Sequence, residues 1–270
     1  MSGPMPGQKI SLPGVKHVIA VASGKGGVGK STVAANLSLA LRAAGQRVGL
    51  MDADIYGPSV PLMFGLGLVD QTKVPFPIEK YGINLMSMGF LVDPAQAIIW
   101  RGPKVAQAVG TFLVQVPWGD LDFLIIDLPP GTGDAQLTLS QQAPLTGAIV
   151  VTQPAEVSLI DARKGVSMFQ EVRVPILGII ENMSYLETPS GRVSPFGSGG
   201  GRKLAGEIGV PLLGEIPIEP LVSTCGDTGE PIVRKHPDHP VSLAYARLAQ
   251  TVIDETAKQP DSGGLPTVQL

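Results

Sequence analysis

The stretch from Ser23 to Thr32 reads S-G-K-G-G-V-G-K-S-T, and it constrains the fold of this chain more than any other segment. It satisfies the phosphate-loop pattern G-x-x-x-x-G-K-[ST], in which a glycine-rich turn joins a strand to a helix. The short apolar run His17–Val21 precedes it, and the Ala- and Leu-rich run Ser31–Ala44 follows it. The chain therefore contains both the strand and the helix that the pattern requires, and we predict a nucleoside triphosphate site here.

The residue types of this loop fit the chemistry of phosphate binding. Glycines let several backbone N–H groups point inward, and the start of the following helix adds its partial positive charge. Lys30 is expected to reach the β- and γ-phosphates, and the Ser31 hydroxyl is expected to hold Mg²⁺. The residues expected to surround the nucleotide in this loop are Gly24, Lys25, Gly26, Gly27, Val28, Gly29, Lys30, Ser31 and Thr32.

Apolar runs alternate with helix-like segments along the rest of the chain. The strand candidates are His17–Val21, Arg47–Met51, Ile83–Met86, Phe123–Ile126, Ala148–Val151, Ile176–Ile180 and Pro211–Ile216. The helix candidates are Ser31–Ala44, Lys104–Val116, Ala135–Gln142, Val157–Val172, Gly201–Ile208 and Val241–Ala257. This alternation predicts an α/β fold with a mostly parallel sheet and helices on both faces. We expect a single phosphate-loop domain at residues 15–258, between a flexible arm at 1–14 and a disordered tail at 259–270.

Composition narrows the class of protein. Hydrophobic residues make up 44% of the 270 residues and charged residues 16%, which suits strands that are buried on both faces. The single cysteine excludes an intramolecular disulfide framework. No apolar run approaches the roughly 18 residues of a membrane span, and no signal-peptide pattern opens the chain, so we expect a cytoplasmic protein without a membrane partner. A net charge of −3 and a pI of about 5.6 argue against binding to nucleic acid.

Two strand candidates end in carboxylates. The run Phe123–Ile126 leads into Asp127, which in phosphate-loop enzymes holds Mg²⁺, usually through water. The segment P-P-G-T-G-D follows at 129–134, and its glycines allow the backbone to approach the γ-phosphate and to rearrange when that phosphate leaves. At the end of the second strand, one of Asp52 and Asp54 could orient an attacking water while the other steadies the metal shell. The structural alternative for each is a residue that caps the end of a strand.

Three further positions carry side chains that could bind a ligand. Asn182 follows the strand Ile176–Ile180, and its amide matches the edge of adenine, although its position alone favours a residue that caps a loop. His236 and His239 have H-x-x-H spacing without a third ligand close by, which favours a solvated loop. Cys225 has no neighbouring cysteine and suits a small buried position.

The phosphate loop, with its second lysine at Lys25, resembles that of the ATPases that include MinD, ParA, the arsenical pump ATPase and the nitrogenase iron protein. Four further runs are similar to the Mrp/ApbC-type iron–sulfur cluster carriers. These runs are D-A-D-I-Y-G-P-S at 52–59, D-L-P-P-G-T-G-D at 127–134, E-N-M-S at 181–184 and F-G-S-G-G-G at 196–201. The resemblance extends from about Lys16 to the segment Asp227–Pro231, which is nearly the whole predicted domain.

The resemblance implies a homodimeric ATPase that binds ATP and Mg²⁺ and works in iron–sulfur cluster assembly, with client apoproteins or assembly proteins as partners. It implies that Lys25 crosses the dimer interface to the phosphates bound by the partner, as an arginine finger does in other enzymes. The other roles that it implies are a phosphate contact for Lys30, Mg²⁺ contacts for Ser31 and Asp127, positioning of water for Asp54 and an adenine contact for Asn182.

One segment departs from the pattern of these carriers. They commonly have C-P-x-C shortly after N-M-S, so that two cysteines from each subunit hold a shared cluster. Here Thr188 and Gly191 stand at the cysteine positions, although Pro189 is retained. Neither residue supplies the thiolate that an iron–sulfur cluster needs. We therefore expect no stable four-cysteine cluster at this segment, and any cluster would draw on Cys225 and non-thiolate ligands and would be labile.

Two other functions fit parts of the sequence. One is a nucleotide-switched organiser of the MinD or ParA kind, which dimerises with ATP and recruits partners. MinD-like membrane switches usually end in a basic amphipathic helix, which Gln259–Leu270 is not, and ParA-like proteins need a basic surface for DNA. The other is an ATP-dependent ligase, for which the chain shows no feature that would bind a second substrate.

Overall fold

The structure is a computed structural model that describes residues 11–55, 57–67, 76–90, 110 and 113–259. Most of the expected N-terminal arm, most of the helix expected at Lys104–Val116 and nearly all of the expected C-terminal tail lie outside these residues.

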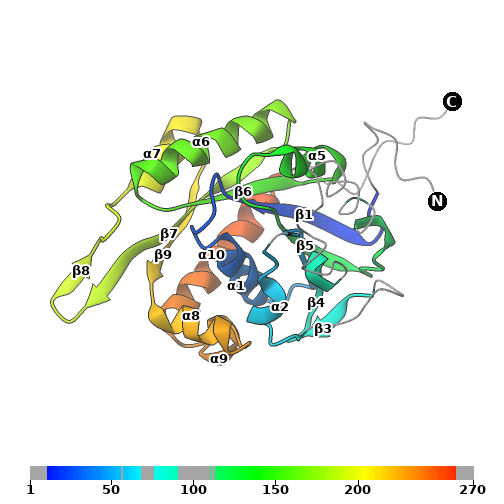
Figure 1. The fold of residues 1–270 in the computed structure, drawn as a ribbon, viewed down its shortest axis with the longest axis horizontal. Helices are drawn as coiled ribbons and strands as arrows, with labels where there is room; N and C mark the ends of the chain where they lie inside the picture. Colours follow the sequence, from blue (N-terminus) through cyan, green and yellow to red (C-terminus); the bar gives the residue numbers. More distant parts are fainter. Residues whose placement is uncertain (1–10, 56, 68–75, 91–109, 111–112, 260–270) are drawn as a thin grey trace.

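Nine strands in the described part of the chain form one sheet (Figure 1). Its order is β3-β4-β2-β5-β1-β6-β7-β8, and β9 pairs with β7 as well. The strands are β1 (Val15–Ala22), β2 (Val48–Asp52), β3 (Ile78–Lys80), β4 (Ile83–Ser87), β5 (Leu121–Asp127), β6 (Gly147–Thr152), β7 (Ile176–Thr188), β8 (Gly191–Val193) and β9 (Leu212–Ile218).

The centre of the sheet is parallel and apolar. β1 lies between β5 and β6, and β2 lies between β5 and β4, all in parallel pairs. Ile19, Leu50 and Ile125 on three of these strands are fully buried. Strands covered on both faces need such continuous apolar runs. The predicted mostly parallel α/β fold is therefore confirmed.

The antiparallel pairs lie at the margins of the sheet. β3 pairs with β4 and β8 pairs with β7 in this way. β3 and β8 were not predicted, because three residues carry too little alternation to be recognised as a strand. The predicted strand that begins at Ile176 also ended too early. β7 continues to Thr188, so that Asn182 lies within a strand.

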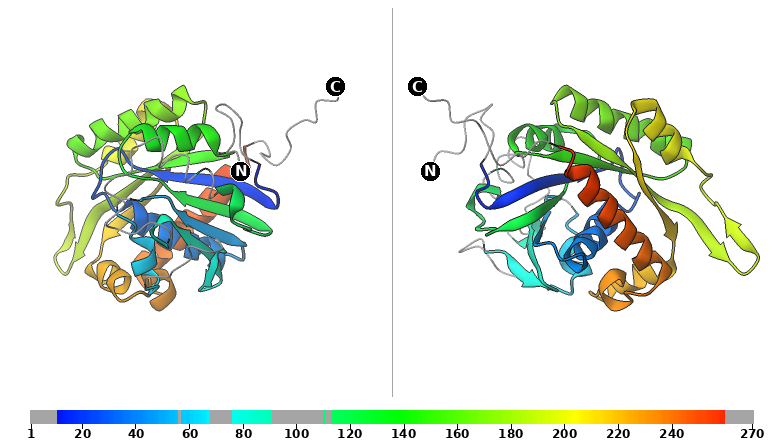
Figure 2. Two further views of the ribbon diagram at one scale, coloured as in Figure 1. Left: turned by 45° about the vertical axis from the view of Figure 1, so that its right-hand side comes forward. Right: turned by 180° about the vertical axis from the view of Figure 1, so that it is seen from behind.

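Helices cover both faces of the sheet (Figures 1 and 2). On one face lie α5 (Asp134–Gln142), α6 (Glu156–Glu171) and α7 (Gly200–Ile208). On the other face lie α1 (Lys30–Ala43), α2 (Val60–Met63), α8 (Pro220–Asp227), α9 (Ile232–Lys235) and α10 (Pro240–Thr256), and the 3₁₀ turn η1 (Met88–Phe90) follows β4. Five of the predicted helices match within one residue at each end, whereas the short α2, α8 and α9 were not predicted.

The longest helix in the described part, α10, shows why these segments form where they do. Its buried residues include Val241, Tyr245, Leu248 and Val252, which follow one another at helical spacing and form one apolar stripe. This stripe packs α10 against α1 and β9. Pro240 at the first helical position suits the start of the helix because its missing N–H needs no partner there. No helix in the described residues combines the length and the apolar character needed to cross a membrane.

The order of the strands brings the carboxyl ends of β1, β2 and β5 together. Val21 on β1 is paired with Asp127 on β5, and Asp127 is paired in turn with Asp52 on β2. Ligands of open parallel sheets bind outside the carboxyl ends of the strands. The loop after β1 and the carboxylates of Asp52 and Asp127 therefore lie at the same edge of the sheet, where a ligand is expected to bind.

Candidate nucleotide-binding site

The loop at residues 23–29 turns tightly between β1 and α1. Gly27 and Gly29 both have φ of +81°, a left-handed conformation that glycine adopts without strain. A Cβ atom on Gly24 would lie 2.0 Å from the backbone carbonyl of Asp161 on α6, so this position also requires glycine. The first turn of α1 has no side-chain cap and no acidic residue. Its N–H groups are consequently suited to an anion.

Lys30 and Asp127 form a buried ion pair at the mouth of this loop. Lys30 Nζ lies 2.5 Å from Asp127 Oδ1 and 3.2 Å from Ser31 Oγ, and the side chains of Lys30 and Asp127 are 6% and 0% exposed. Burial raises the pKa of Asp127, and the Lys30 ammonium opposes that rise. The structure thus brings together three residues that the sequence analysis assigned to phosphate and metal binding.

The donor atoms around Asp127 fit a Mg²⁺ ion. Asp127 Oδ2 is buried and has no hydrogen-bond partner in the described part of the chain. The hydroxyl of Ser31 lies next to the same ion pair. Carboxylate and hydroxyl oxygens are the hard ligands that Mg²⁺ takes, so the residues present are compatible with this cofactor.

Asp52 and Asp54 have different surroundings, although they lie two residues apart. Asp52 is fully buried and accepts hydrogen bonds from the backbone N–H of Asp54 at 3.1 Å, from Val60 N–H at 3.3 Å and from Ser87 Oγ at 3.1 Å. Burial and the neighbouring Asp127 carboxylate raise the pKa of Asp52 to about 8. Asp52 therefore shapes the turn from β2 to α2, and this supports the capping alternative for that residue.

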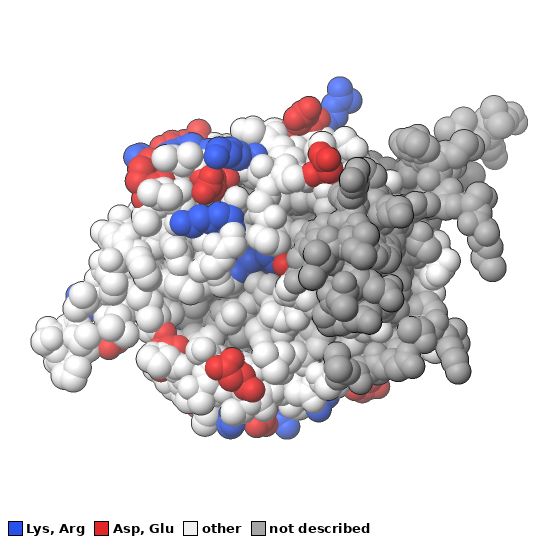
Figure 3. All heavy atoms as spheres, viewed as in Figure 1, with Lys and Arg blue, Asp and Glu red and all other residues white. Residues whose placement is uncertain are grey.

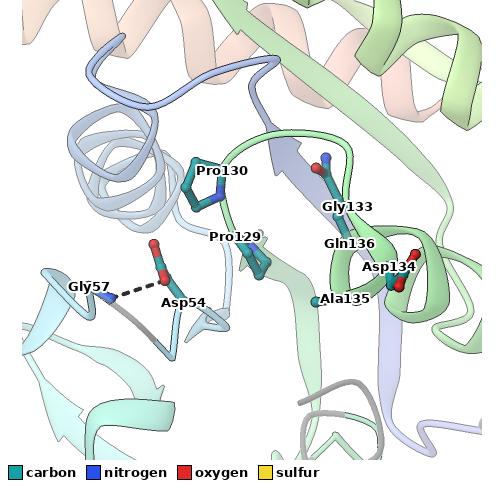
Figure 4. A pocket seen from close by; sticks show the side chains of 8 residues that line it. All are labelled: Asp54, Gly57, Pro129, Pro130, Gly133, Asp134, Ala135 and Gln136. Carbon is teal, nitrogen blue, oxygen red and sulfur yellow. Dashed lines mark hydrogen bonds between the residues drawn. The ribbon is translucent and has the colours of Figure 1, made fainter. Parts of the chain in front are cut away.

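Asp54 lines a cavity of about 500 Å³ (Figure 4). Its Oδ1 accepts a hydrogen bond from the backbone N–H of Gly57 at 3.1 Å. The other lining residues are Gly57, Pro129, Pro130, Gly133, Asp134, Ala135 and Gln136, most of which belong to the loop after β5 and the first turn of α5. Asp54 thus faces the glycine-rich segment that follows Asp127.

Two amide side chains from the neighbouring strands contact the phosphate loop. Asn182 Nδ2 on β7 donates to the carbonyl of Val28 at 2.8 Å, and Asn182 is 6% exposed. Gln153, directly after β6, donates from Nε2 to the carbonyl of Gly27 at 3.4 Å. The sequence analysis placed Asn182 at the nucleotide but missed Gln153. The signal available was its position at the carboxyl end of a buried strand.

Lys25 projects from the same loop. It is half-buried, and its side chain forms no ion pair or hydrogen bond with any other residue that the structure describes. Only its backbone carbonyl is engaged, by a hydrogen bond from Ser23 Oγ at 2.8 Å. Its ammonium group is therefore not held by an acidic partner among the residues that the structure describes.

The segment at the cysteine positions of the carriers forms the tip of a hairpin. Thr188 on β7 pairs with Gly191 on β8, and Thr188 Oγ1 donates to the carbonyl of Gly191 at 2.6 Å. This hairpin extends away from the body of the fold (Figure 1). Cys225 lies instead on α8 and is 1% exposed. In Figure 1 the helix α8 lies apart from β8. Burial raises the pKa of the Cys225 thiol.

The two histidines of the H-x-x-H spacing lie between α9 and α10. His239 caps α10, because its Nδ1 accepts a hydrogen bond from the backbone N–H of Val241 at 3.3 Å. His236 follows the last turn of α9. Within the described ranges, no three His, Cys, Asp or Glu side chains gather as metal ligands.

Comparisons with known proteins agree with this geometry. Residues 14–253 match the family model described as "ParA: NUBPL iron-transfer P-loop NTPase". The chain is 53% identical over 248 residues to the iron–sulfur cluster carrier protein of Aquifex aeolicus, and this match covers 89% of the chain and 68% of the relative. These matches confirm the resemblance to the carriers.

Solved structures show the same fold. A nucleotide-binding protein from Archaeoglobus fulgidus, in complex with ADP, superposes with a TM-score of 0.71 at 38% identity, covering 85% of this chain and 91% of that one. The septum site-determining protein MinD from Pyrococcus horikoshii, complexed with Mg-ADP, gives a TM-score of 0.68 at 26% identity, covering 90% and 97%. The chain therefore belongs to the ParA/NUBPL family of iron-transfer P-loop NTPases.

Proposed function

We propose that this protein is an ATP-hydrolysing carrier or assembly factor for iron–sulfur clusters, that it acts as a homodimer in the cytoplasm, and that it delivers its cargo to client apoproteins. The observation that carries the nucleotide part is the cluster of Lys30, Ser31 and Asp127 beside an uncapped helix start. The cargo is inferred from the relative in Aquifex aeolicus, which is named an iron–sulfur cluster carrier protein.

Binding of ATP would replace Asp127 by the phosphates as the partner of the Lys30 ammonium. In the structure this ammonium group is neutralised by Asp127. The β- and γ-phosphates carry more negative charge than a carboxylate and lie within reach of the same ammonium, so Lys30 turns to them. Asp127 then becomes available, with Ser31, to hold Mg²⁺, which supplies neutralisation of phosphate charge when it is bound.

The remaining groups would act on the two ends of the nucleotide. Asp54 orients the attacking water, and the partner's Lys25 stabilises the charge that develops during transfer of the phosphoryl group. Asn182 donates one N–H to the phosphate loop and retains its carbonyl oxygen, which can accept a hydrogen bond from the adenine amino group.

The cargo site must differ from that of carriers with C-P-x-C. The hairpin tip offers the hydroxyl of Thr188 and no thiolate, and the thiol of Cys225 is buried. A cluster carried by this chain would therefore be held weakly or together with ligands from a partner protein.

A nucleotide-switched organiser is the second candidate, and the structural likeness to MinD favours it. Charges of both signs are interspersed over α6 and α7 on the face shown in Figure 3, where Arg163 pairs with Glu156 and Glu207. A DNA-binding surface of the ParA kind needs clustered basic residues. We therefore rank the organiser below the carrier.

The nucleotide part is tested with Lys30→Met, which keeps the length of the side chain and removes its charge. We expect it to lower the turnover of ATP at least about a hundredfold and to weaken binding of ATP, because it removes the cation that faces the phosphates. Lys258→Met, at a residue whose side chain is 64% exposed just beyond the end of α10, is the matched control and should hydrolyse ATP normally. Hydrolysis at the wild-type rate by Lys30→Met would refute the assignment.

The cargo part is tested by anaerobic reconstitution with iron and sulfide, followed by visible absorption and by transfer to an apo-ferredoxin. Wild type should take up a labile cluster and transfer it, and Cys225→Ser should take up less, because the chain has no other cysteine. A stable cluster in both proteins would contradict our view of the ligands. If wild type transfers no cluster under any nucleotide condition, the carrier function is wrong.

A further inference from the structure

Gln136 on α5 is a buried amide that this structure leaves unpaired. Its residue is 1% exposed, and neither Nε2 nor Oε1 has a hydrogen-bond partner in the described part of the chain. Such an amide can form as many as four hydrogen bonds, and burying it without them is unfavourable. An apolar side chain of the same shape would be more stable in this conformation, so the structure itself does not explain a glutamine here.

The unpaired amide lies against the loop that follows Asp127. Figure 4 shows the side chain of Gln136 beneath the arch that the chain forms between Pro130 and Gly133. Gln136 and Asp54 line the same cavity of about 500 Å³. The first turn of α5 is not capped by a side chain, because Gly133 occupies the N-cap position. The groups nearest in sequence that could pair with the amide are the peptide groups of this arch.

The arch itself is held in a conformation that does not use Gln136. The N–H of Gly131 donates to the carbonyl of Ser23 in the phosphate loop at 3.2 Å. The N–H of Gly131 is therefore already bound to the Ser23 carbonyl. A bound γ-phosphate would compete with that carbonyl for this N–H. Gly131 has φ of +90°, so its backbone can change conformation at low cost. Release of the Ser23 carbonyl would free the arch to move over the amide of Gln136.

We propose that Gln136 is a positioning residue for ATP hydrolysis: with ATP bound, its amide pairs with the backbone of residues 130–133 and holds this arch against the γ-phosphate. This inference rests on the proposed ATPase function. Without nucleotide the amide has no hydrogen-bond partner among the described residues, and with ATP it gains both a donor and an acceptor contact. The unpaired amide raises the free energy of the nucleotide-free state, whereas the paired amide does not raise that of the ATP-bound state. The difference favours the ATP-bound conformation.

The test compares Gln136→Met with wild type, since methionine keeps the unbranched shape and removes both polar groups. We expect the thermal midpoint of the nucleotide-free protein to stay the same or rise, and the dissociation constant for ATP to change less than about threefold, which is below 1 kcal/mol. The kcat should fall at least about tenfold, because a small displacement of catalytic groups has effects of that size or larger. Gln141→Met, at an exposed position of the same helix, is the control and should leave all three values unchanged.

A second variant, Gln136→Glu, separates a hydrogen-bonding role from simple packing. A protonated glutamic acid offers one donor and one acceptor, whereas its carboxylate offers only acceptors. The kcat of Gln136→Glu relative to wild type should therefore rise as the pH falls, and the relative kcat of Gln136→Met should not depend on pH.

The outcomes distinguish this inference from the function on which it rests. A wild type that hydrolyses ATP, together with Gln136→Met at the same kcat, would overturn the positioning role alone. The same holds if Gln136→Met unfolds at a lower temperature and loses ATP binding in proportion to its activity, since Gln136 would then serve packing. A wild type that does not hydrolyse ATP would overturn both.

Discussion

Three aspartates at one edge of the sheet show how surroundings decide the task of a residue. Asp52 is buried and accepts three hydrogen bonds, so it organises the turn after β2. Asp127 is equally buried, but it pairs with Lys30 and keeps one oxygen without a hydrogen-bond partner among the residues described. Asp54 is partly exposed and faces a cavity. Three identical side chains therefore supply a structural cap, a charge partner and a carboxylate that lines a cavity.

At the residue scale, Asp54→Asn and Asp127→Asn should have different effects. Asp54→Asn is expected to keep ATP binding and to lower kcat about a hundredfold or more, because the amide replaces one of the two acceptor oxygens with which we expect Asp54 to orient the attacking water. Asp127→Asn is expected to weaken the dependence of ATP binding on Mg²⁺, since it removes the negative charge of the carboxylate that we expect to contact the metal. Calorimetric titration at several Mg²⁺ concentrations and turnover assays measure the two effects. Asp254→Asn, exposed on α10, is the control, and equal defects in both site variants would contradict this division of roles.

At the element scale, a polar clamp holds the amino ends of three central strands opposite the nucleotide edge. Asp122 on β5 lies 2.8 Å from Lys16 Nζ on β1 and accepts hydrogen bonds from both the side chain and the backbone N–H of Arg47, which precedes β2. The Arg47 guanidinium, with help from Lys16, holds the pKa of Asp122 well below its usual range. The ion pairs of the clamp therefore require the ionised carboxylate of Asp122.

The clamp predicts a dependence of stability on pH. A carboxyl group whose pKa is lowered by folding stabilises the folded state above its unfolded pKa, near 4, and loses this effect as the pH falls further. Asp122→Asn should therefore reduce the free energy of unfolding by about 1 kcal/mol at pH 7, and the difference should shrink below about pH 4. Urea denaturation at pH 7 and pH 3 measures it. Asp120→Asn, whose side chain is 79% exposed, should change little, and a constant deficit of Asp122→Asn at both pH values would argue against the clamp.

At the scale of the whole molecule, the face beside the phosphate loop has features of an interface. The ammonium of Lys25 has no ion-pair partner among the described residues of the chain. Val157 and Ile160 on α6 are 65% and 50% exposed, and Gly24 packs directly against Asp161 of the same helix. Apolar side chains grouped at the surface mark sites of protein contact. A second copy that covers this face would bring its own Lys25 to the nucleotide.

This arrangement predicts complementation between two inactive variants. Lys25→Ala should lose hydrolysis while each subunit still binds ATP, since its own Lys30 and loop N–H groups remain. When Lys25→Ala is mixed with Asp54→Ala, one site of each heterodimer receives an intact Lys25 from the partner and keeps its own Asp54. We expect hydrolysis to recover in proportion to the heterodimer fraction. Heterodimers that form, as shown by mass spectrometry, and remain inactive would disprove action across the interface.

The local sequence was sufficient for the phosphate loop and for the main helices and strands. Glycines with left-handed φ, such as Gly27 and Gly29, are required by the turn itself, and apolar periodicity depends only on residues a few positions apart. The predicted helices outside the 104–116 segment match for this reason. Elements of three or four residues, such as β3, β8 and α9, carry too few positions for a pattern, and neighbours distant in sequence decide their conformation.

Contacts between distant residues were decided only by the tertiary structure. Lys30 meets Asp127 across 97 residues, and Asn182 meets Val28 across 154, because the strand order places β5 and β7 near β1. The resemblance named Asp127 and Asn182, but it did not reveal that Lys30 pairs with the first or that the second is bound to the loop. The buried, unpaired amide of Gln136 had no signal in the sequence at all. A residue's type sets what it can bind, whereas its burial and its partners depend on how all the strands and helices pack, and local pattern does not encode that packing.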